Sequence, residues 1–437
     1  MASTAEKYKS DGSLAGNALE WVDARFPAMA LYKEHLSEYY APKNFNFWYF
    51  FGSLALLVLV NQIVTGIFLV MHYKPDAALN ASGVPVAFAS VEYIMRDVPL
   101  GWIIRYMHST GASAFFVVVY LHMFRGMLYG SYRKPRELIW LFGIGIFLCL
   151  MAEAFFGYLL PWGQMSFWGA QVIVNLFSAI PIVGPDLSVF IRGDFVVSDA
   201  TLNRFFSFHV IAIPLVLLGL VAAHLIALHE VGSNNPDGVE IKKHKNEKGI
   251  PLDGIPFHPY YTVKDMVGVV VFLMVFTVVI CFMPEFGGYF LEWNNFIPAD
   301  PLKTPPHIAP VWYFTPFYSL LRAVTYPFLG IDAKFWGVVA MGGGVVIMAF
   351  LPWLDRSAAK SIRYRGKIYK TMLAIWVVGF MLLGFLGTKP PSYAFFGVIP
   401  GAPVAQILSV YYFLYFITMP WWSKADKCKP EPERVTG

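Results

Sequence analysis

The stretch RYMHSTGASAFFVVVYLHMFRG, residues 105–126, contains two histidines, His108 and His122, with mostly small or apolar residues between them. On an α-helix, this spacing of fourteen leaves the second side chain about 40° from the first and about 21 Å further along the axis. Both imidazoles therefore lie on one side of the helix, at two depths of a bilayer core about 30 Å thick. A single intramembrane histidine is commonly explained by a hydrogen bond to a neighbouring helix, whereas a pair suggests a second pair elsewhere.

The second pair lies in RFFSFHVIAIPLVLLGLVAAHLIALHE, residues 204–230, where His209 and His224 are fifteen residues apart. Their helical rise is about 22 Å, close to that of the first pair. Two apolar helices thus each carry two histidines at nearly the same vertical separation. This geometry predicts two metal centres, one above the other, each bound by one histidine from each helix.

The composition places the chain in a membrane. Of 437 residues, 57% are hydrophobic and only 14% are charged, and the apolar runs are long enough to span a bilayer. We expect an all-α membrane protein with eight transmembrane helices. We expect the first four helices to form a bundle around the histidines. The spans are predicted near residues 47–72, 106–129, 138–160, 205–228, 266–283, 334–353, 369–387 and 404–422.

Lysine and arginine are distributed unevenly between the loops. With the N-terminus in the cytoplasm, the cytoplasmic segments hold 23 Lys and Arg, and the four opposite segments hold 8. The positive-inside rule then places both termini in the cytoplasm of a bacterial cell, with the protein in the inner membrane. In this orientation His108 and His209 form the outer pair, and His122 and His224 form the inner pair.

The loops divide the chain into five parts. We expect a cytoplasmic amphipathic segment (1–43), a four-helix bundle (44–230), a basic cytoplasmic loop (231–264), a four-helix C-terminal domain (265–422) and a cytoplasmic tail (423–437). Residues 1–43 lack the pattern of a cleavable signal peptide. The outer loops 163–204 and 285–333 are long and apolar, so we expect them to form short surface helices that build a site.

Two histidines from opposite helices suit a haem iron that carries electrons, because they leave no coordination position open. Zinc would need further ligands nearby, and the sequence supplies none at the right level. The three cysteines are scattered, and there is no C-x-x-C-H motif for covalent haem attachment. The sequence therefore predicts two non-covalent b-type haems.

Glycines and arginines recur at the same levels as the histidines. The first span carries Gly52 and Gly66, and the third carries Gly143 and Gly157, again fourteen apart. A flat porphyrin edge needs a helix face without side chains, although small-residue packing between membrane helices gives similar patterns. Arg105 and Arg125 flank the outer and inner levels, where haem propionates need cations. Alternatively, both arginines lie at helix ends and extend their charged groups to the membrane–water interface.

Four further motifs extend the pattern across most of the chain: GYLLPWGQMSFWGA at 157–170, LHEVGSNNP at 228–236, PYYTVKD at 259–265 and DPLKTPPHIAPVWYF at 300–314. With them, residues 40–420 resemble the cytochrome b of the cytochrome bc1 complex, the ubiquinol:cytochrome c oxidoreductase, in its full-length bacterial form. The resemblance departs at His209 and His224, because the mitochondrial type usually has a spacing of fourteen. We expect a local bulge or a rotated ring near Pro214 to absorb the extra residue.

The resemblance implies an outer site that oxidises quinol beside the His108/His209 haem. Residues that match the family there are Tyr158, Trp162, Gly163, Gly169, Pro310, Trp312 and Tyr313. The family usually has a glutamate between Pro310 and Trp312 that is proposed to accept a quinol proton, but this chain has Val311. We predict that Glu292 replaces it as the base, with Glu285 and Asp300 as competitors. A solvated loop charge is the simpler explanation for each.

The resemblance also implies an inner site that reduces quinone, as ubiquinone, beside the His122/His224 haem. Matching residues are His229, Ser233, Asn235, Lys264 and Asp265. A histidine and a carboxylate on either side of a quinone can deliver two protons. Asp265 at a helix start is also a candidate N-cap. Glu153, in the third span, indicates either a proton or water path near the outer site or a hydrogen-bonded structural role.

The predicted function is bifurcated oxidation of quinol, with one electron crossing the membrane through both haems and protons moving across it. The resemblance implies a Rieske iron–sulfur protein and cytochrome c1 as partners, within a homodimeric complex. No Cys/His cluster in the chain suits an iron–sulfur centre. Two alternatives remain: a diheme membrane anchor of a dehydrogenase or hydrogenase, which would be shorter and lack the long outer loops, and a transporter or scaffold without haem.

Overall fold

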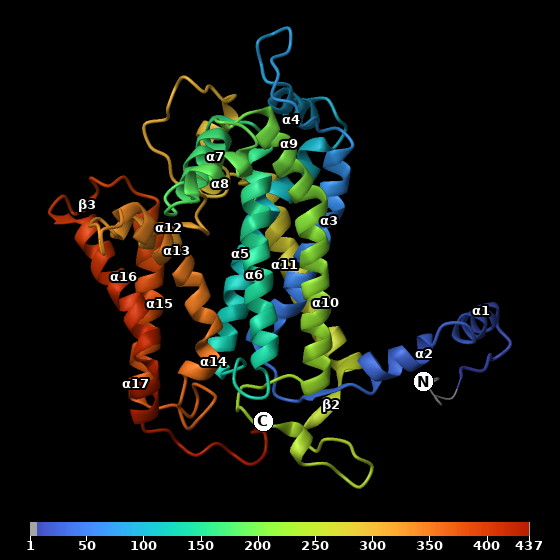
Figure 1. Ribbon diagram of the computed structural model, residues 1–437. Helices are drawn as coiled ribbons and strands as arrows, with labels where there is room; N and C mark the ends of the chain where they lie inside the picture. Colours follow the sequence, from blue (N-terminus) through green and yellow to red (C-terminus); the bar gives the residue numbers. More distant parts are fainter. Residues whose placement is uncertain (1–6, 437) are drawn as a thin grey trace.

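The computed structural model describes residues 7–436, and long helices that run nearly side by side dominate it (Figure 1). Four of them form the first half of the molecule: α3 (Phe50–Val70), α5 (Gly101–Tyr129), α6 (Glu137–Leu159) and α10 (Ile213–Val231). They are apolar almost all round, as expected where a helix must satisfy its backbone polar groups internally in lipid. In this bundle α3 packs against α5 and α6 packs against α10.

The second half packs beside this bundle. It consists of α12 (Thr315–Ala323), α13 (Ala333–Ala349), α14 (Leu351–Leu354), α15 (Lys367–Gly387), α16 (Gly401–Ile417) and α17 (Met419–Ala425). The helix α11 (Thr262–Phe282) packs against α3 and α5. One continuous core of buried aromatic and aliphatic residues joins the halves, with Phe116 and Phe147 from the bundle and Phe317 and Trp376 from the second half.

Each of the eight predicted spans is helical, but they are not equally regular. Six helices of the described residues are long and apolar enough to cross a membrane, and α16 with α17 makes a seventh if the pair is one span. That pair bends by 66°, with Thr418 between the two helices. The sixth predicted span is shorter than expected, because α13 has only 17 residues before the short α14. The prediction of eight full spans is therefore supported only in part.

The predicted outer loops lie at the upper end of the molecule in Figure 1 and contain the expected short helices. The first loop forms α7 (Gln164–Phe177), α8 (Gly184–Arg192) and α9 (Asp199–Ser207), while the second forms η6 (Phe286–Gly288), η7 (Trp293–Phe296) and α12. The two loops are joined by backbone hydrogen bonds from Gln164 to Ile297 (2.9 Å) and from Ala299 to Trp162 (3.0 Å). The upper end also carries α4 (Val86–Arg96) and the hairpin of β3 (Ala394–Phe395) and β4 (Ile399–Pro400).

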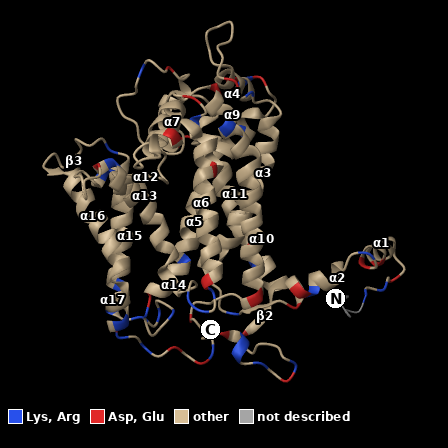
Figure 2. Ribbon diagram, in the orientation of Figure 1, with Lys and Arg blue, Asp and Glu red and all other residues tan. Residues whose placement is uncertain are grey.

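The lower end carries both termini and most of the lysine and arginine (Figures 1 and 2). Its N-terminal segment forms α1 (Leu14–Asp23), α2 (Ala28–Tyr32) and the π-helix η1 (Lys33–Ser37). The strand β1 (Tyr40–Pro42) then pairs antiparallel with β2 (Gly254–Pro256), which ties this segment to the predicted basic loop. Three further short helices complete the lower end: η2 (Phe47–Tyr49), η4 (Ile241–Lys243) and η5 (Phe257–Tyr261).

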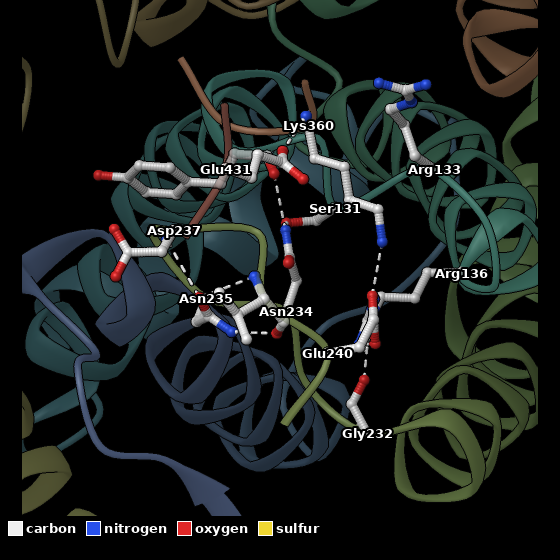
Figure 3. Close-up of polar contacts among 12 residues, drawn as sticks. Ser131, Arg133, Arg136, Gly232, Asn234, Asn235, Asp237, Glu240, Lys360 and Glu431 are labelled. Atoms are coloured by element: carbon white, nitrogen blue, oxygen red, sulfur yellow. Dashed lines mark hydrogen bonds and ion pairs between the residues drawn. The ribbon is translucent and has the colours of Figure 1, made fainter. Parts of the chain in front are cut away.

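A partly buried charged network holds the lower loops together (Figure 3). Glu240 accepts hydrogen bonds from Arg136 (2.7 and 2.9 Å) and from Lys360 (2.6 Å), so it connects the two halves of the chain. Arg136 also donates to the carbonyl of Gly232 (2.8 Å). Burial alone would raise the pKa of Glu240, but the hydrogen bonds and charges of Arg136 and Lys360 outweigh it and lower that pKa to about 2.

Candidate functional site

The four histidines form two ring pairs between α5 and the continuous helix made of α9, η3 (Phe208–Ala212) and α10. The ring centroids of His108 and His209 are 6.0 Å apart at the upper level, and those of His122 and His224 are 6.4 Å apart at the lower level. Two imidazoles that bind one metal ion from opposite sides, with bonds of about 2 Å, have centroids about 6 Å apart. The spacing at both levels therefore suits one metal ion between the two rings.

Each ring also faces a glycine of the neighbouring span. A Cβ atom added at Gly66 would lie 3.2 Å from His108 Cε1, and one at Gly52 would lie 3.4 Å from His122 Cε1. At Gly143 the added atom would lie 3.6 Å from His224 Cε1, and at Gly157 it would clash with His209. Glycine thus keeps the space at each histidine pair free of side chains on both flanking helices, as a flat macrocycle requires.

The fifteen-residue spacing of His209 and His224 is accommodated by a π-helix. The segment η3 (Phe208–Ala212) contains His209 and lies between α9 and α10, just before Pro214. A π-helical turn takes up one more residue than an α-helical turn, so the extra residue is absorbed at the upper ring. The predicted bulge is therefore confirmed, and it keeps His209 at the level of His108.

At the upper level, the Nδ1 atoms of both rings are held by neighbouring groups. Thr65 Oγ1 lies 3.1 Å from His108 Nδ1 and donates its own proton to the Asn61 carbonyl at 2.6 Å, so it accepts from the imidazole. His209 Nδ1 lies 3.0 Å from both the carbonyl and the carboxylate of Glu153. Because Nδ1 carries the proton in this arrangement, Nε2 is free to bind a metal.

At the lower level, Arg125 lies beside His122, with its terminal nitrogen 3.2 Å from His122 Nδ1. Its guanidinium also lies 4.9 Å from the centre of the Tyr49 ring. Arg125 Nε and His224 Nδ1 are buried without a hydrogen-bond partner among the described residues. A buried guanidinium with an unpaired N–H suits an anionic group such as a propionate.

Among residues 7–436, no group of three or more His, Cys, Asp or Glu side chains is arranged to hold a metal ion. A protein-only zinc site would need such a group. A haem would need only two ligands from the protein, because the porphyrin supplies the other four. The ring spacing and the glycines therefore fit a haem at each level better than a bare metal ion, and the unpaired Arg125 nitrogen supports this at the lower level.

The upper histidine pair opens onto a cavity of about 350 Å³. Its wall includes Gly66, Arg105 and Gly157 from the predicted haem site, together with Glu153. Tyr158 and Tyr313, which are predicted for the quinol site, line the same space, as does Val311 at the position of the family's glutamate. A small molecule held by these residues would lie next to the upper pair of histidines.

The first outer loop packs closely around Tyr158. A Cβ atom at Gly169 would lie 3.7 Å from the Tyr158 ring, so this glycine lies against it. Gly163 lies against Asn295 of the second loop, and its backbone pairs with Pro298. Trp162 is buried in a separate cluster with Phe167 and does not line the cavity. These residues therefore shape and join the loops, while Tyr158 faces the cavity.

The segment Pro310–Trp312–Tyr313 is fastened to α5. The Tyr313 ring stacks on Phe116, with centroids 3.9 Å apart, and its carbonyl accepts a hydrogen bond from Tyr120 at 2.6 Å. Trp312 Nε1 donates to Ser113 Oγ at 3.0 Å. Pro310 is half-buried and does not line the cavity. Stacking and hydrogen bonds thus hold Tyr313 rigidly at the cavity wall.

Of the three acidic candidates in the second loop, Glu292 directly adjoins a residue that lines the cavity. It precedes the helix η7, and its neighbours Leu291 and Asn295 line the cavity, although Glu292 itself is not part of the wall. Burial raises the pKa of the Glu292 carboxyl. Glu285 instead accepts a hydrogen bond from Trp293 (2.8 Å), and the exposed Asp300 caps the backbone of Leu302 (2.9 Å).

At the lower end, His229 lies between two side chains of the N-terminal segment. Its ring centroid is 5.1 Å from that of His35 and 4.7 Å from that of Tyr39. Ser233 joins this group through a 3.3 Å contact between its hydroxyl and the Tyr39 hydroxyl. His229 Nδ1 lies 2.9 Å from the Leu225 carbonyl and donates to it, so Nε2 is free in the neutral ring.

Lys264 and Asp265 line a second cavity of about 320 Å³, which His229 and Ser233 do not reach. Phe257 lines this cavity and lies 6.2 Å from Tyr39 between ring centroids, so the two parts of the predicted inner site are adjacent. Asp265 belongs to the first turn of α11, whose N-cap is Tyr261. The prediction of Asp265 as an N-cap was therefore wrong.

Asn235 does not join the lower site. Its side chain is fully buried, donates to the Val239 carbonyl (2.6 Å) and accepts from the Asp237 backbone (3.0 Å). These bonds shape the loop that carries Glu240, and among the described residues Asn235 makes no side-chain hydrogen bond to the other residues predicted for the lower site. Its place in the predicted quinone site has no support in its contacts.

Sequence reasoning missed His35, Tyr39 and Thr65. Thr65 lies directly before Gly66, a position that could have marked it as a partner for a facing histidine. His35 and Tyr39 lie four residues apart in the amphipathic segment, but no spacing within the sequence links them to His229, which lies about 190 residues away. In the structure, the pairing of β1 with β2 and the contacts of η1 with η5 hold this segment at the lower end of the bundle.

Comparison with known proteins agrees with this geometry. Residues 36–232 match the family model described as "Cytochrome b/b6/petB", and residues 298–421 match "Cytochrome b(C-terminal)/b6/petD". The chain is 62% identical to the cytochrome b of Allochromatium vinosum, over 96% of this chain and 98% of that protein. It is 47% identical to the cytochrome b of Rhodospirillum rubrum, over 96% of each.

A solved structure and a fused relative extend the comparison. A chain of the "Hyperthermophilic respiratory Complex III" superposes with a TM-score of 0.81 at 38% identity, over 92% of this chain and 98% of that one. The "Cytochrome b/c1" of Bradyrhizobium diazoefficiens is 44% identical over 98% of this chain, which spans 58% of that longer protein. With both family models matched along its length, the chain belongs to the cytochrome b family.

Proposed function

We propose that this chain is the diheme, quinol-oxidising subunit of a respiratory bc1 complex, in which it oxidises quinol at the upper site and reduces quinone at the lower site. The observation that carries the proposal is the cavity shared by the upper histidine pair with Tyr158 and Tyr313. A quinol in that space would release its electrons next to an iron held by His108 and His209. The match to a Complex III chain supports the same assignment.

His108 and His209 would hold the upper haem, and His122 and His224 would hold the lower one. When bound, each haem would accept and pass on one electron at a time. Gly66 and Gly157 would admit the upper macrocycle, and Gly52 and Gly143 the lower one. Arg105 and Arg125 would pair with the propionates. Thr65 and Glu153 would orient the upper rings through Nδ1.

At the upper site the protein has to position quinol and accept its protons. Tyr313, held by Phe116 and Tyr120, and Tyr158, packed on Gly169, form rigid walls for a flat ring. We assign proton acceptance to the Glu292 carboxylate, because Val311 at the cavity wall cannot take a proton. Glu292 lies beside cavity residues, so a small movement of η7 would bring it to a bound quinol.

At the lower site His229 and Asp265 would supply the two protons that turn quinone into quinol. His229 presents a free Nε2, and Ser233 and Lys264 supply polar contacts on either side. The concentration of Lys and Arg at this end supports its assignment to the cytoplasmic face (Figure 2). Protons would then be taken up from the cytoplasm and released on the opposite side.

The bifurcated reaction needs an acceptor for the first electron of quinol. The three cysteines, Cys149, Cys281 and Cys428, are free and far apart in the sequence, so an iron–sulfur centre would have to come from a partner. We propose a Rieske iron–sulfur protein and a cytochrome c1 as partners, in a dimeric complex in the bacterial inner membrane. The fused "Cytochrome b/c1" relative supports the association with c1.

A redox titration of membranes enriched in the complex tests the proposal, with haem counted per chain from the α-band absorbance. We expect two b-type haems with separate midpoint potentials. The haem at the upper level should have the lower midpoint potential. His108→Leu should remove the low-potential haem and quinol oxidation with it. One haem or none in the unmodified protein would overturn the proposal.

A further inference from the structure

The exposed imidazole of His35 lies against the lower end of the four-helix bundle. It lies beside His229, the histidine predicted for the lower quinone site. His35 belongs to the π-helix η1, and His229 is near the end of α10, 194 residues later. Their rings meet edge to face, with centroids 5.1 Å apart and planes at 84°. His35 is exposed, whereas His229 is half-buried.

The backbone holds His35 in this place. The strand β1 pairs with β2, and the Phe257 amide donates to the Tyr39 carbonyl at 2.8 Å. Tyr39 therefore packs on His229 from one side, with ring centroids 4.7 Å apart, and η1 places His35 against the same ring. Figure 1 shows this N-terminal segment passing beneath the lower end of α10.

The hydrogen-bond pattern leaves one nitrogen of His229 available. Because His229 Nδ1 donates to the Leu225 carbonyl, Nε2 is the atom that can gain and lose a proton. No other histidine of the described residues has its ring in contact with the His229 ring. His35 is therefore the one histidine of the described residues whose ring lies beside the His229 ring.

We propose that His35 is a proton-delivery residue for the lower site: it takes a proton from cytoplasmic water and passes it to His229 Nε2. This inference rests on the proposed quinone reduction at that site. Quinone there gains two electrons, one from each of two quinols oxidised at the upper site, and two protons to become quinol. His229 gives one of those protons, and His35 restores it and is then reloaded from water. His35 supplies no electrons and does not touch the quinone.

If His35 only packed against His229, any aromatic ring of similar shape could replace it. A phenylalanine at this position therefore distinguishes packing from proton delivery. His35→Phe keeps an aromatic ring against His229 but cannot carry a proton. With the upper site blocked by a selective inhibitor, we expect this variant to slow electron exchange between a short-chain ubiquinone analogue and the lower haem about tenfold. The slowed rate should also become more sensitive to D₂O, which a packing defect would not cause. His244→Phe, which removes another exposed histidine at the same end, should match the unmodified protein.

Rescue by imidazole gives the second measurement. His35→Ala should be slow, and added imidazole should restore its rate, whereas pyrazole, a ring of the same size that is a much weaker base, should not. A His35→Phe variant at the unmodified rate, or equal rescue by both rings, would overturn the proposal. His229→Phe separates the two assignments: if this variant still exchanges electrons normally, the lower quinone site itself is wrong. If only His229 proves necessary, the site stands and the role of His35 falls.

Discussion

Gly66 of α3 faces His108 of α5 so closely that an added Cβ atom would lie 3.2 Å from the imidazole carbon Cε1. Gly52 has the same relation to His122 one level lower. The glycine spacing and the histidine spacing are both fourteen, so one helical repeat brings each glycine to its histidine. At each of two depths, α3 therefore places a glycine opposite a histidine of α5.

Gly66→Val should abolish haem binding at the upper level and leave the lower haem in place. The branched side chain would fill the space beside His108 that the macrocycle needs. Haem per chain, measured with the midpoint potentials, should fall from two to one, and the lower-potential component should be the one lost. Gly219→Val on α10 is the matched control, because a Cβ atom there meets nothing within 4 Å. Two haems in Gly66→Val would contradict the proposed cradle.

Thr65→Val should raise the midpoint potential of the upper haem. Thr65 Oγ1 accepts the His108 Nδ1 proton, which increases electron density on the ligand and favours the oxidised iron. Losing one such bond, worth about 1 kcal/mol, corresponds to about 40 mV for a one-electron couple. A redox titration measures the shift. The control, Thr110→Val, removes a hydroxyl that bonds to the Pro284 carbonyl instead. Equal potentials in both variants would rule out tuning by Thr65.

Glu292→Gln should slow quinol oxidation markedly while both haems remain. Burial raises the pKa of the Glu292 carboxyl above its ordinary value of 4.5. Since a base must be deprotonated to accept a proton, the rate of quinol oxidation should fall as the pH decreases through a value above 4.5. The glutamine variant should be slow throughout and lack this limb. Asp300→Asn serves as the control. Normal turnover in Glu292→Gln would dismiss Glu292 as the base.

Glu240→Gln should destabilise the protein by about 3 kcal/mol, because it leaves the buried Arg136 guanidinium without its anion. The Glu240 and Arg136 side chains are only 19% and 5% exposed. Thermal unfolding of the detergent-solubilised protein measures the loss.

The same ion pair carries a pH dependence. The folded pKa of Glu240, about 2, lies below its ordinary 4.5, so the stabilisation is complete above about pH 4.5 and disappears as the pH falls toward 2. Glu92→Gln breaks an exposed pair with Arg96, at 44% and 75% exposure, and should change stability by less than about 1 kcal/mol. Equal effects of the two variants would show that the Glu240 network stabilises the protein no more than an exposed ion pair does.

Much of the candidate site follows from periodicity along the chain. The histidine and glycine spacings set which residues share a level, because a straight helix relates residues by a fixed rotation and rise. The π-helix at His209 was predictable for the same reason, since fifteen residues do not fit the repeat. The eight apolar stretches predict the helices themselves, although not the short α13 or the bend at Thr418.

Contacts between distant segments were decided only by the tertiary structure. Whether Glu292 or Glu285 lies beside the upper cavity depends on how the two outer loops pair, at Trp162 and Ala299. Asn235 was predicted at the lower site beside Ser233, but its side chain forms hydrogen bonds within its own loop. His35 reaches His229 because β1 pairs with β2. Helical repeats are local and readable from the sequence, whereas the folding of loops depends on partners far along the chain.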